Sequence, residues 1–109
     1  MKVSAFEIAS RYVLPSLKRR LAEIMLKEYG FTQKEIARIL GVSEAAVSRY
    51  ISGERGHYLR IENLKGVDEK LRRIVEAFQR RETNTLAVHY MLHIIAAEMM
   101  AEKRLCAIH

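Results

Sequence analysis

The chain has 109 residues, which is enough for one folded domain and too few for a two-domain enzyme. Half of the residues are hydrophobic and 29% are charged, while five Gly, one Pro and no Trp leave few chain-breaking residues, so a helical fold is expected. The formal net charge of +6 favours a polyanionic partner, and 12 of the 19 basic residues lie in residues 1–66, although basic solvated faces are also common.

A single cysteine, Cys106, allows no disulfide within the chain, and a reducing compartment is therefore expected. Every apolar run ends at a charged residue or a histidine well before the length of a membrane span. Residues 1–14 lack the continuous apolar core of a signal peptide. These observations predict a cytoplasmic protein that has no membrane partner.

Two helices are predicted before Gly30. The sequence Ser4 to Glu7 has the form of a capping box, in which the serine hydroxyl accepts a hydrogen bond from a first-turn amide, so a helix begins there. Pro15 lacks an N–H group and disfavours helix in the residue before it, which predicts a break near Leu14 and a new helix from Pro15. Apolar residues at helical spacing carry this second helix to Gly30.

Two short helices joined by a three-residue turn are predicted next. Thr32 and Glu35 form a second capping box, which opens a helix that ends at Gly41. Ser43 is the expected N-cap of the following helix, and Gly53 ends it.

The remainder of the chain is predicted to be a loop followed by two helices. Residues 53–66 show no sustained period and are expected to form a partly ordered loop, although alternation over residues 57–62 leaves a short strand open. Asp68 is expected to cap the next helix. After the polar residues 83–85, a last helix is predicted over residues 86–104.

The two short helices have the residues that a steep crossing over a tight turn requires. Ala37 is small where the helices approach, and Gly41 can take positive φ in the turn. The inner faces are apolar, with Ile36, Leu40, Val42, Val47, Tyr50 and Ile51. This segment, residues 33–52, resembles the helix-turn-helix of Cro- and Xre-type prokaryotic transcription regulators, with residues 43–52 as the recognition helix. The resemblance implies an all-α, DNA-binding fold, and an ordinary helical bundle is the alternative.

A wider stretch is similar to a narrower family. Residues 12–19 and 52–56, together with the helix pair, resemble small, mainly archaeal predicted regulators whose helix-turn-helix is sometimes fused to a thiamine-phosphate synthase-type domain. Members of that family often carry a cysteine near the N-terminus and a Cys-x-x-Cys near the C-terminus. This chain has Ala5 in the first region, and Cys106 with His109 in the second. The difference speaks against an inherited metal or redox role.

The predicted recognition helix presents short side chains around one long cation, which suits the major groove of double-stranded DNA. Arg49 is expected to donate to guanine, with a solvated surface arginine as the alternative. The base-reading candidates are Ser43, Glu44, Ala45, Ser48, Arg49 and Ser52. Ser48 and Ser52 could instead meet phosphates, and Glu44 could merely complement the helix dipole. The phosphate-contacting candidates are Gln33, Lys34, Arg38, Arg55 and Lys18.

The last helix is apolar on nearly every side over residues 86–101. A chain this small cannot cover such a helix alone, so a homodimer through it and residues 71–78 is expected, with recognition helices about 34 Å apart. The alternative is a helix at the core centre of a monomer. The predicted organisation is a DNA-binding head over residues 1–56, a connecting loop over 57–66 and a dimerisation region over 67–109.

Four metal-ligand types lie near the C-terminus, namely His89, His93, Cys106 and His109. His93 and Cys106 are 13 residues apart, about 20 Å in a helix, so they cannot share a metal unless the tail folds back. An antiparallel dimer would bring the two groups closer. The prediction is that the chain holds no metal.

No catalytic constellation is visible in the sequence, so neither an enzyme nor a cofactor is expected. The predicted function is that of a sequence-specific DNA-binding transcription regulator, a repressor that acts as a homodimer. The alternative is a protein-interaction adaptor or antitoxin-like module whose apolar last helix binds another protein. The sequence specifies no operator, regulated gene or effector ligand.

Overall fold

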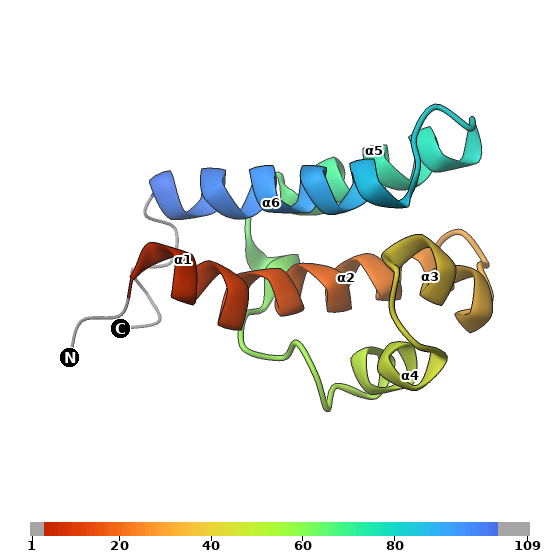
Figure 1. Ribbon diagram of the computed structural model, residues 1–109, viewed down its shortest axis with the longest axis horizontal. Helices are drawn as coiled ribbons and strands as arrows, with labels where there is room; N and C mark the ends of the chain where they lie inside the picture. The colour runs from red at the N-terminus through yellow and green to blue at the C-terminus, as the bar shows by residue number, and fades with distance from the viewer. Residues whose placement is uncertain (1–3, 103–109) are drawn as a thin grey trace.

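A computed structural model of the chain describes residues 4–102, and every regular element in that range is helical (Figure 1). The elements in chain order are α1 (Ala5–Ile8), the π-helix η1 (Ala9–Val13), α2 (Leu14–Lys27), α3 (Gln33–Leu40), α4 (Glu44–Ser52), the 3-10 helix η2 (Ile61–Asn63), α5 (Val67–Gln79) and α6 (Thr85–Ala101). Residues 4–102 contain no strand, so the predicted all-α class is confirmed.

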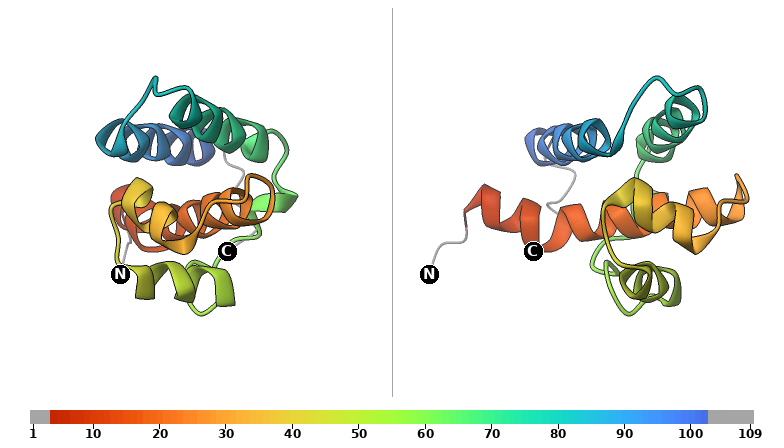
Figure 2. Two further views of the ribbon diagram at one scale, coloured as in Figure 1. Left: turned by 90° about the vertical axis from the view of Figure 1, so that its right-hand side faces the viewer. Right: turned by 45° about the vertical axis from the view of Figure 1, so that its right-hand side comes forward.

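The helices form three tiers with α2 in the middle (Figures 1 and 2). The pair α5 and α6 lies on one side of α2, and α4 lies on the opposite side. α2 contacts each of α3, α4, α5 and α6. Leu17, Leu21 and Ala22 of α2 are fully buried within the same apolar cluster as Val47 of α4 and Leu92 of α6. The centre of the core is therefore α2, and α6 lies at its edge.

The chain passes through Pro15 without the predicted break, so that prediction is wrong (Figure 1). The backbone remains right-handed helical at Leu14, whose N–H donates to the Ala9 carbonyl five residues back. This π-turn widens the helix just before Pro15 and gives room to a ring that would otherwise press on the carbonyl four residues back. Ser16 Oγ donates to the Tyr12 carbonyl at 2.8 Å, which satisfies an acceptor in the widened turn.

The ends of α3 and α4 follow the sequence signals. Thr32 accepts a hydrogen bond from the Glu35 amide while the Glu35 carboxylate accepts one from the Thr32 amide, so the capping box is complete. Ser43 caps α4 in the same way at the Ala46 amide. The glycines that follow the two helices, Gly41 and Gly53, are left-handed with φ of +67° and +83°. The predicted bounds of both helices are confirmed.

In the segment after α4, the strand alternative is excluded and one expectation, the cap at Asp68, is wrong. Residues 57–62 form no strand but lead into η2, because a single strand has no partner for its backbone groups. Asp68 does not cap α5, since Gly66 occupies the N-cap position. Asp68 instead accepts hydrogen bonds from Arg20 Nε and Nη2 at 2.9 and 2.8 Å. Such a bidentate ionic pair is stronger than one bond from a helix amide.

The loop after α4 is fixed by the Arg19 side chain, which is only 5% exposed. Arg19 Nε donates to the Gly56 carbonyl at 2.8 Å, and Nη2 donates to the Leu59 carbonyl at 3.0 Å. Glu23 and Glu62 accept from the same guanidinium at 2.6 and 3.1 Å. The loop that was predicted to be partly ordered is therefore tied to α2 by a buried charge whose partners all lie close by.

α6 is buried along one face only. Val88, Leu92, Ile95, Ala96 and Met99 face the core. The other faces of this helix are partly exposed to solvent in a single copy of the chain. Such exposure was expected because the helix is apolar on nearly every side. The alternative of a helix at the core centre of a monomer does not fit its place at the edge of the fold (Figure 2).

Replacement of Gly56 by Ala is expected to destabilise the fold far more than replacement of Gly30. Both glycines have positive φ, +75° and +69°, so each alanine costs about 1–2 kcal/mol of backbone strain. A Cβ at Gly56 would also lie 2.3 Å from the Pro15 carbonyl oxygen, whereas one at Gly30 meets nothing within 4 Å. Overpacking adds roughly 1–3 kcal/mol. Urea unfolding followed by circular dichroism measures both, and equal losses would contradict the close contact.

Replacement of Asp68 by Asn is expected to lower stability at neutral pH by roughly 1–3 kcal/mol. Hydrogen bonds from Arg20 hold the pKa of Asp68 below its ordinary 3.8. The stabilisation is therefore complete above that value and is lost as the pH falls through the lower, folded-state pKa. The unfolding free energies of the two proteins should begin to approach each other at about pH 4 and should meet only below the folded-state pKa of Asp68. A difference that persists unchanged in strong acid would show that the pair acts through packing alone.

Candidate nucleic-acid interface

The helices α3 and α4 pack on each other across the turn at Gly41. The Val42 amide donates to the Ala37 carbonyl at 3.0 Å, which closes the turn. The inner faces are buried, with Ile36, Ala37, Ile39 and Leu40 from α3 and Ala46, Val47 and Tyr50 from α4. The apolar lock predicted from the sequence is thus formed, and the outer surface of α4 faces away from α2 (Figure 1).

The outer surface of α4 holds the predicted base-reading residues together. Ser43, Glu44, Ala45, Ser48, Arg49 and Ser52 are all exposed. The face is slim because every side chain on it except Glu44 and Arg49 is small. A helix with such a face can approach base edges in a major groove about 12 Å wide.

The three serine hydroxyls of this face already have partners within the protein. Ser43 Oγ accepts from the Ala46 amide, and Ser52 Oγ donates to the Arg49 carbonyl at 3.2 Å. Ser48 Oγ donates to Gln33 Oε1 at 2.8 Å, which joins the start of α3 to the middle of α4. This last contact has no local sequence signal, since its residues lie 15 positions apart. Each hydroxyl keeps hydrogen-bonding capacity for an external partner.

The basic side chains divide into two groups. Arg19, Arg20 and Arg72 are held by carboxylates within the fold. Within residues 4–102, none of the cations predicted to meet DNA forms an ion pair: Lys18, Lys34, Arg38, Arg49 and Arg55. Lys34, Arg38, Arg49 and Arg55 are exposed. The structure therefore leaves this set available to an external anion.

Lys18 and Arg55 lie close enough to repel each other. Burial lowers the pKa of Lys18, and the charge of Arg55 lowers it further. The Arg55 guanidinium also lies over the Tyr50 ring, 5.9 Å from its centroid, so it is held at the end of α4. Within residues 4–102 neither of these two cations forms an ion pair with a carboxylate. A phosphate group bound beside them would relieve their repulsion.

The candidate metal ligands form no metal-binding group within the described part of the chain. Residues 4–102 contain no group of three or more His, Cys, Asp or Glu side chains that could hold an ion. His93 Nδ1 lies 2.7 Å from the His89 carbonyl oxygen, and burial lowers the pKa of His89. Cys106 and His109 lie outside the described residues.

Similarity to a known family is found within residues 21–72. Residues 21–72 match the family model described as helix-turn-helix, a segment that begins in α2, includes all of α3 and α4, and ends in α5. No curated protein and no solved structure matched the chain. The chain thus contains a helix-turn-helix domain, and the match supports a DNA-binding transcription regulator, a class that is generally not enzymatic.

The family match and the packing of the helices both extend beyond the predicted head over residues 1–56. The matched segment continues past residue 56, where the predicted head ends, and α5 and α6 pack directly on α2. The division into a head, a loop and a dimerisation region over residues 1–56, 57–66 and 67–109 stays a prediction. None of the helices in residues 4–102 is both long and apolar enough to span a bilayer.

Proposed function

We propose that this protein is a cytoplasmic, sequence-specific DNA-binding repressor that acts as a homodimer and reads the major groove with α4. The observation that carries the proposal is the exposed, slim outer face of α4 with Arg49 at its centre, within a segment that matches the helix-turn-helix family model. A helix of this shape enters the groove while the preceding helix crosses the phosphate backbone.

Each base-reading residue has a role that its chemistry supports. Arg49 donates two parallel hydrogen bonds to O6 and N7 of a guanine. Ala45 contacts a thymine methyl group, and Glu44 accepts from cytosine N4 or complements the positive N-terminus of α4. Ser43, Ser48 and Ser52 use their remaining hydrogen-bonding capacity on base edges or phosphates.

The phosphate contacts surround this face. Lys34 and Arg38 lie one turn apart on α3, and Gln33 lies at the start of the same helix. Lys18 and Arg55 supply the paired cations at the other end of α4. Contacts of this kind set the register of the protein on DNA and make its affinity fall as salt rises.

A homodimer is proposed because most operators have two-fold symmetry. Two recognition helices about 34 Å apart would then meet successive major grooves. A repressor is proposed because a protein that occupies its DNA site can block transcription without a further activity. The resemblance of residues 12–19 and 52–56 supports a relation to the archaeal regulators whose helix-turn-helix is sometimes fused to a thiamine-phosphate synthase-type domain.

A protein-interaction adaptor or antitoxin-like module is the second candidate, since α6 leaves large apolar side chains exposed. Binding of the purified protein to bulk duplex DNA at two salt concentrations separates the candidates. A regulator loses affinity steeply as salt rises, whereas a pure adaptor binds no duplex even at low salt.

Replacement of Arg49 by Ala is expected to weaken binding to a selected site by about 1–3 kcal/mol and to relax the preference at one base pair. The site is first obtained by selecting bound fragments from random duplexes. Fluorescence anisotropy then compares the wild type and the variant on the selected duplex and on its single-base variants.

Replacement of Lys34 by Ala is the matched comparison, because Lys34 is equally free of ion pairs but lies on α3. Lys34→Ala is expected to weaken binding to all DNA sequences by the same factor. It is also expected to reduce the slope of log affinity against log salt concentration by about one. If Arg49→Ala also weakened every sequence by the same factor, Arg49 would contact a phosphate and the base-reading role would fall.

A further inference from the structure

A small polar pocket is formed by α2, the end of α4 and the loop that follows α4. Its volume is about 280 Å³, and it is lined by Arg19, Glu23, Gly53, His57 and Arg60. Four of these five residues have titratable side chains, so the lining is rich in charge. None of the five is among the residues proposed above to contact DNA. We call this cavity the Arg60 pocket.

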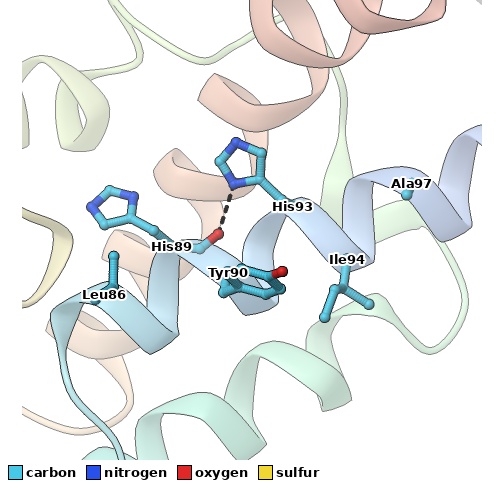
Figure 3. Close-up of a pocket in the computed structure, with 6 residues that line it drawn as sticks. All are labelled: Leu86, His89, Tyr90, His93, Ile94 and Ala97. Atoms are coloured by element: carbon cyan, nitrogen blue, oxygen red, sulfur yellow. Dashed lines mark hydrogen bonds between the residues drawn. The ribbon is translucent and has the colours of Figure 1, made fainter.

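The groove on the outer side of α6 has a different character (Figure 3). Its lining contains no Asp, Glu, Lys or Arg and consists of Leu86, His89, Tyr90, His93, Ile94 and Ala97. A mainly apolar groove selects a ligand chiefly by its shape, whereas a charged lining also selects it by the position of its charges. The Arg60 pocket therefore says more about the chemistry of its ligand.

The Arg19 guanidinium brings an unused donor to the Arg60 pocket. A guanidinium has five N–H groups. Four of those of Arg19 donate within the protein, and their acceptors are Gly56, Leu59, Glu23 and Glu62. The fifth, on Nη1, has no acceptor within residues 4–102, although the side chain is almost fully buried. Because a buried donor without a partner is costly, an acceptor bound in the pocket would be stabilised there.

Arg60 and His57 add two exposed basic side chains to the lining. Arg60 forms no ion pair within residues 4–102. The His57 ring stacks on Tyr58 with centroids 5.1 Å apart, so it is held in place. A guanidinium suits a carboxylate, because its parallel N–H groups match the two oxygens.

Glu23 brings an unused acceptor to the same lining. Its Oε1 atom accepts from Arg19 Nη1 at 2.6 Å and from Arg20 Nη1 at 3.3 Å. Its Oε2 atom accepts no hydrogen bond within residues 4–102. Gly53, the C-cap of α4, also lines the pocket, and the C-terminal end of a helix favours a positive charge. The Arg60 pocket thus offers partners to a positive group as well as to a negative one.

We propose that the Arg60 pocket binds a free α-amino acid. Arg60 and the fifth N–H of Arg19 hold its carboxylate, and Glu23 Oε2 accepts from its ammonium group. A simple anion would lie near an unpaired Glu23 oxygen, whereas an amino acid satisfies the unused donor and the unused acceptor together. The volume of about 280 Å³ lies below the roughly 300–1,000 Å³ of pockets for drug-sized molecules, which limits the ligand to a small one.

A bound amino acid would join the segments that position α4. Glu23 belongs to α2, Gly53 ends α4, and Arg60 lies where the following loop enters η2. The ligand therefore restrains the end of α4 relative to α2, so α4 loses less freedom when it meets DNA. The ligand-bound protein is expected to bind duplex DNA more tightly. This consequence rests on the proposed function, whereas ligand binding itself does not.

Thermal unfolding of the full chain in the presence of each standard α-amino acid tests the proposal without DNA. At about ten times its dissociation constant, a ligand is expected to raise the unfolding midpoint by roughly 5 °C. Isothermal titration calorimetry then measures the affinity of the amino acid that gives the largest shift. Inorganic phosphate and acetate are measured in the same way, as anions without an ammonium group.

Arg60→Ala is expected to weaken amino-acid binding by about 10–100-fold, because it removes ionic hydrogen bonds to the carboxylate. The variant is expected to fold normally, since Arg60 is exposed and has no ion pair within residues 4–102. Arg73→Ala is the matched control, because Arg73 is likewise exposed and unpaired there but lies on α5. It is expected to bind the amino acid as the wild type does.

Three results overturn the proposal. The first is that no amino acid shifts the midpoint or releases heat on titration. The second is that phosphate or acetate binds as tightly as the best amino acid, which would indicate a simple anion site. The third is that Arg60→Ala binds the amino acid unchanged, or that Arg73→Ala weakens binding equally.

DNA binding separates the ligand site from the proposed function. A saturating amino acid is expected to raise the affinity of the wild type for duplex DNA by about 5-fold or more. If the wild type binds the amino acid but no duplex, the DNA-binding function fails and the ligand site stands. If it binds duplex but no amino acid, the ligand site fails and the function stands. A reduced salt dependence in Arg60→Ala would then assign Arg60 to a DNA phosphate.

Discussion

The buried Arg19 guanidinium is the contact on which the placement of the candidate DNA-reading helix depends. A charge removed from water is costly unless donors and acceptors match, and here two carbonyls and two carboxylates surround one side chain of α2. Both carbonyls, at Gly56 and Leu59, belong to the loop that follows α4. α4 is therefore held at both ends, by the tight turn at Gly41 before it and by this loop after it. A recognition element needs such restraint, since an interface that must order itself on binding loses affinity.

The division of the basic residues explains why net charge is an ambiguous guide to function. Arg19, Arg20 and Lys18 are neighbours on α2, yet two of them neutralise carboxylates within the fold and the third lies against another cation. Both arginines share the nearby Glu23, but their other partners lie 37 to 48 residues away in the chain, where no local pattern points to them. Only the folded structure separates the arginines that stabilise the protein from those left for a polyanion. The positive charge that remains on α3, α4 and the following loop is the part that bears on DNA binding.

Local sequence signals predicted the elements that depend on local physics. The caps at Thr32 and Ser43 and the left-handed Gly41 involve groups within four residues of each other, and all were predicted correctly. The failures arose where a distant or unusual contact overrides a local preference. Asp68 pairs with Arg20 instead of capping α5, and Pro15 lies in a continuous helix because a π-turn precedes it. In the candidate site the sequence predicted which side chains share the face of α4, because helical spacing dictates it. It could not predict that Gln33 binds Ser48, which depends on how the two helices cross.

α6 lies outside the part of the chain that matches the helix-turn-helix family model. The family match covers residues 21–72 and ends within α5, so the helix pair and its support are of a common type, while α6 lies outside that segment. α6 uses one face to complete the core and contacts the turn of the helix pair through Thr85. Any partner held on its other face is thereby placed in a fixed relation to α4. Sequence changes on that face of α6 can therefore alter how such a partner is placed without any change in the exposed residues of α4.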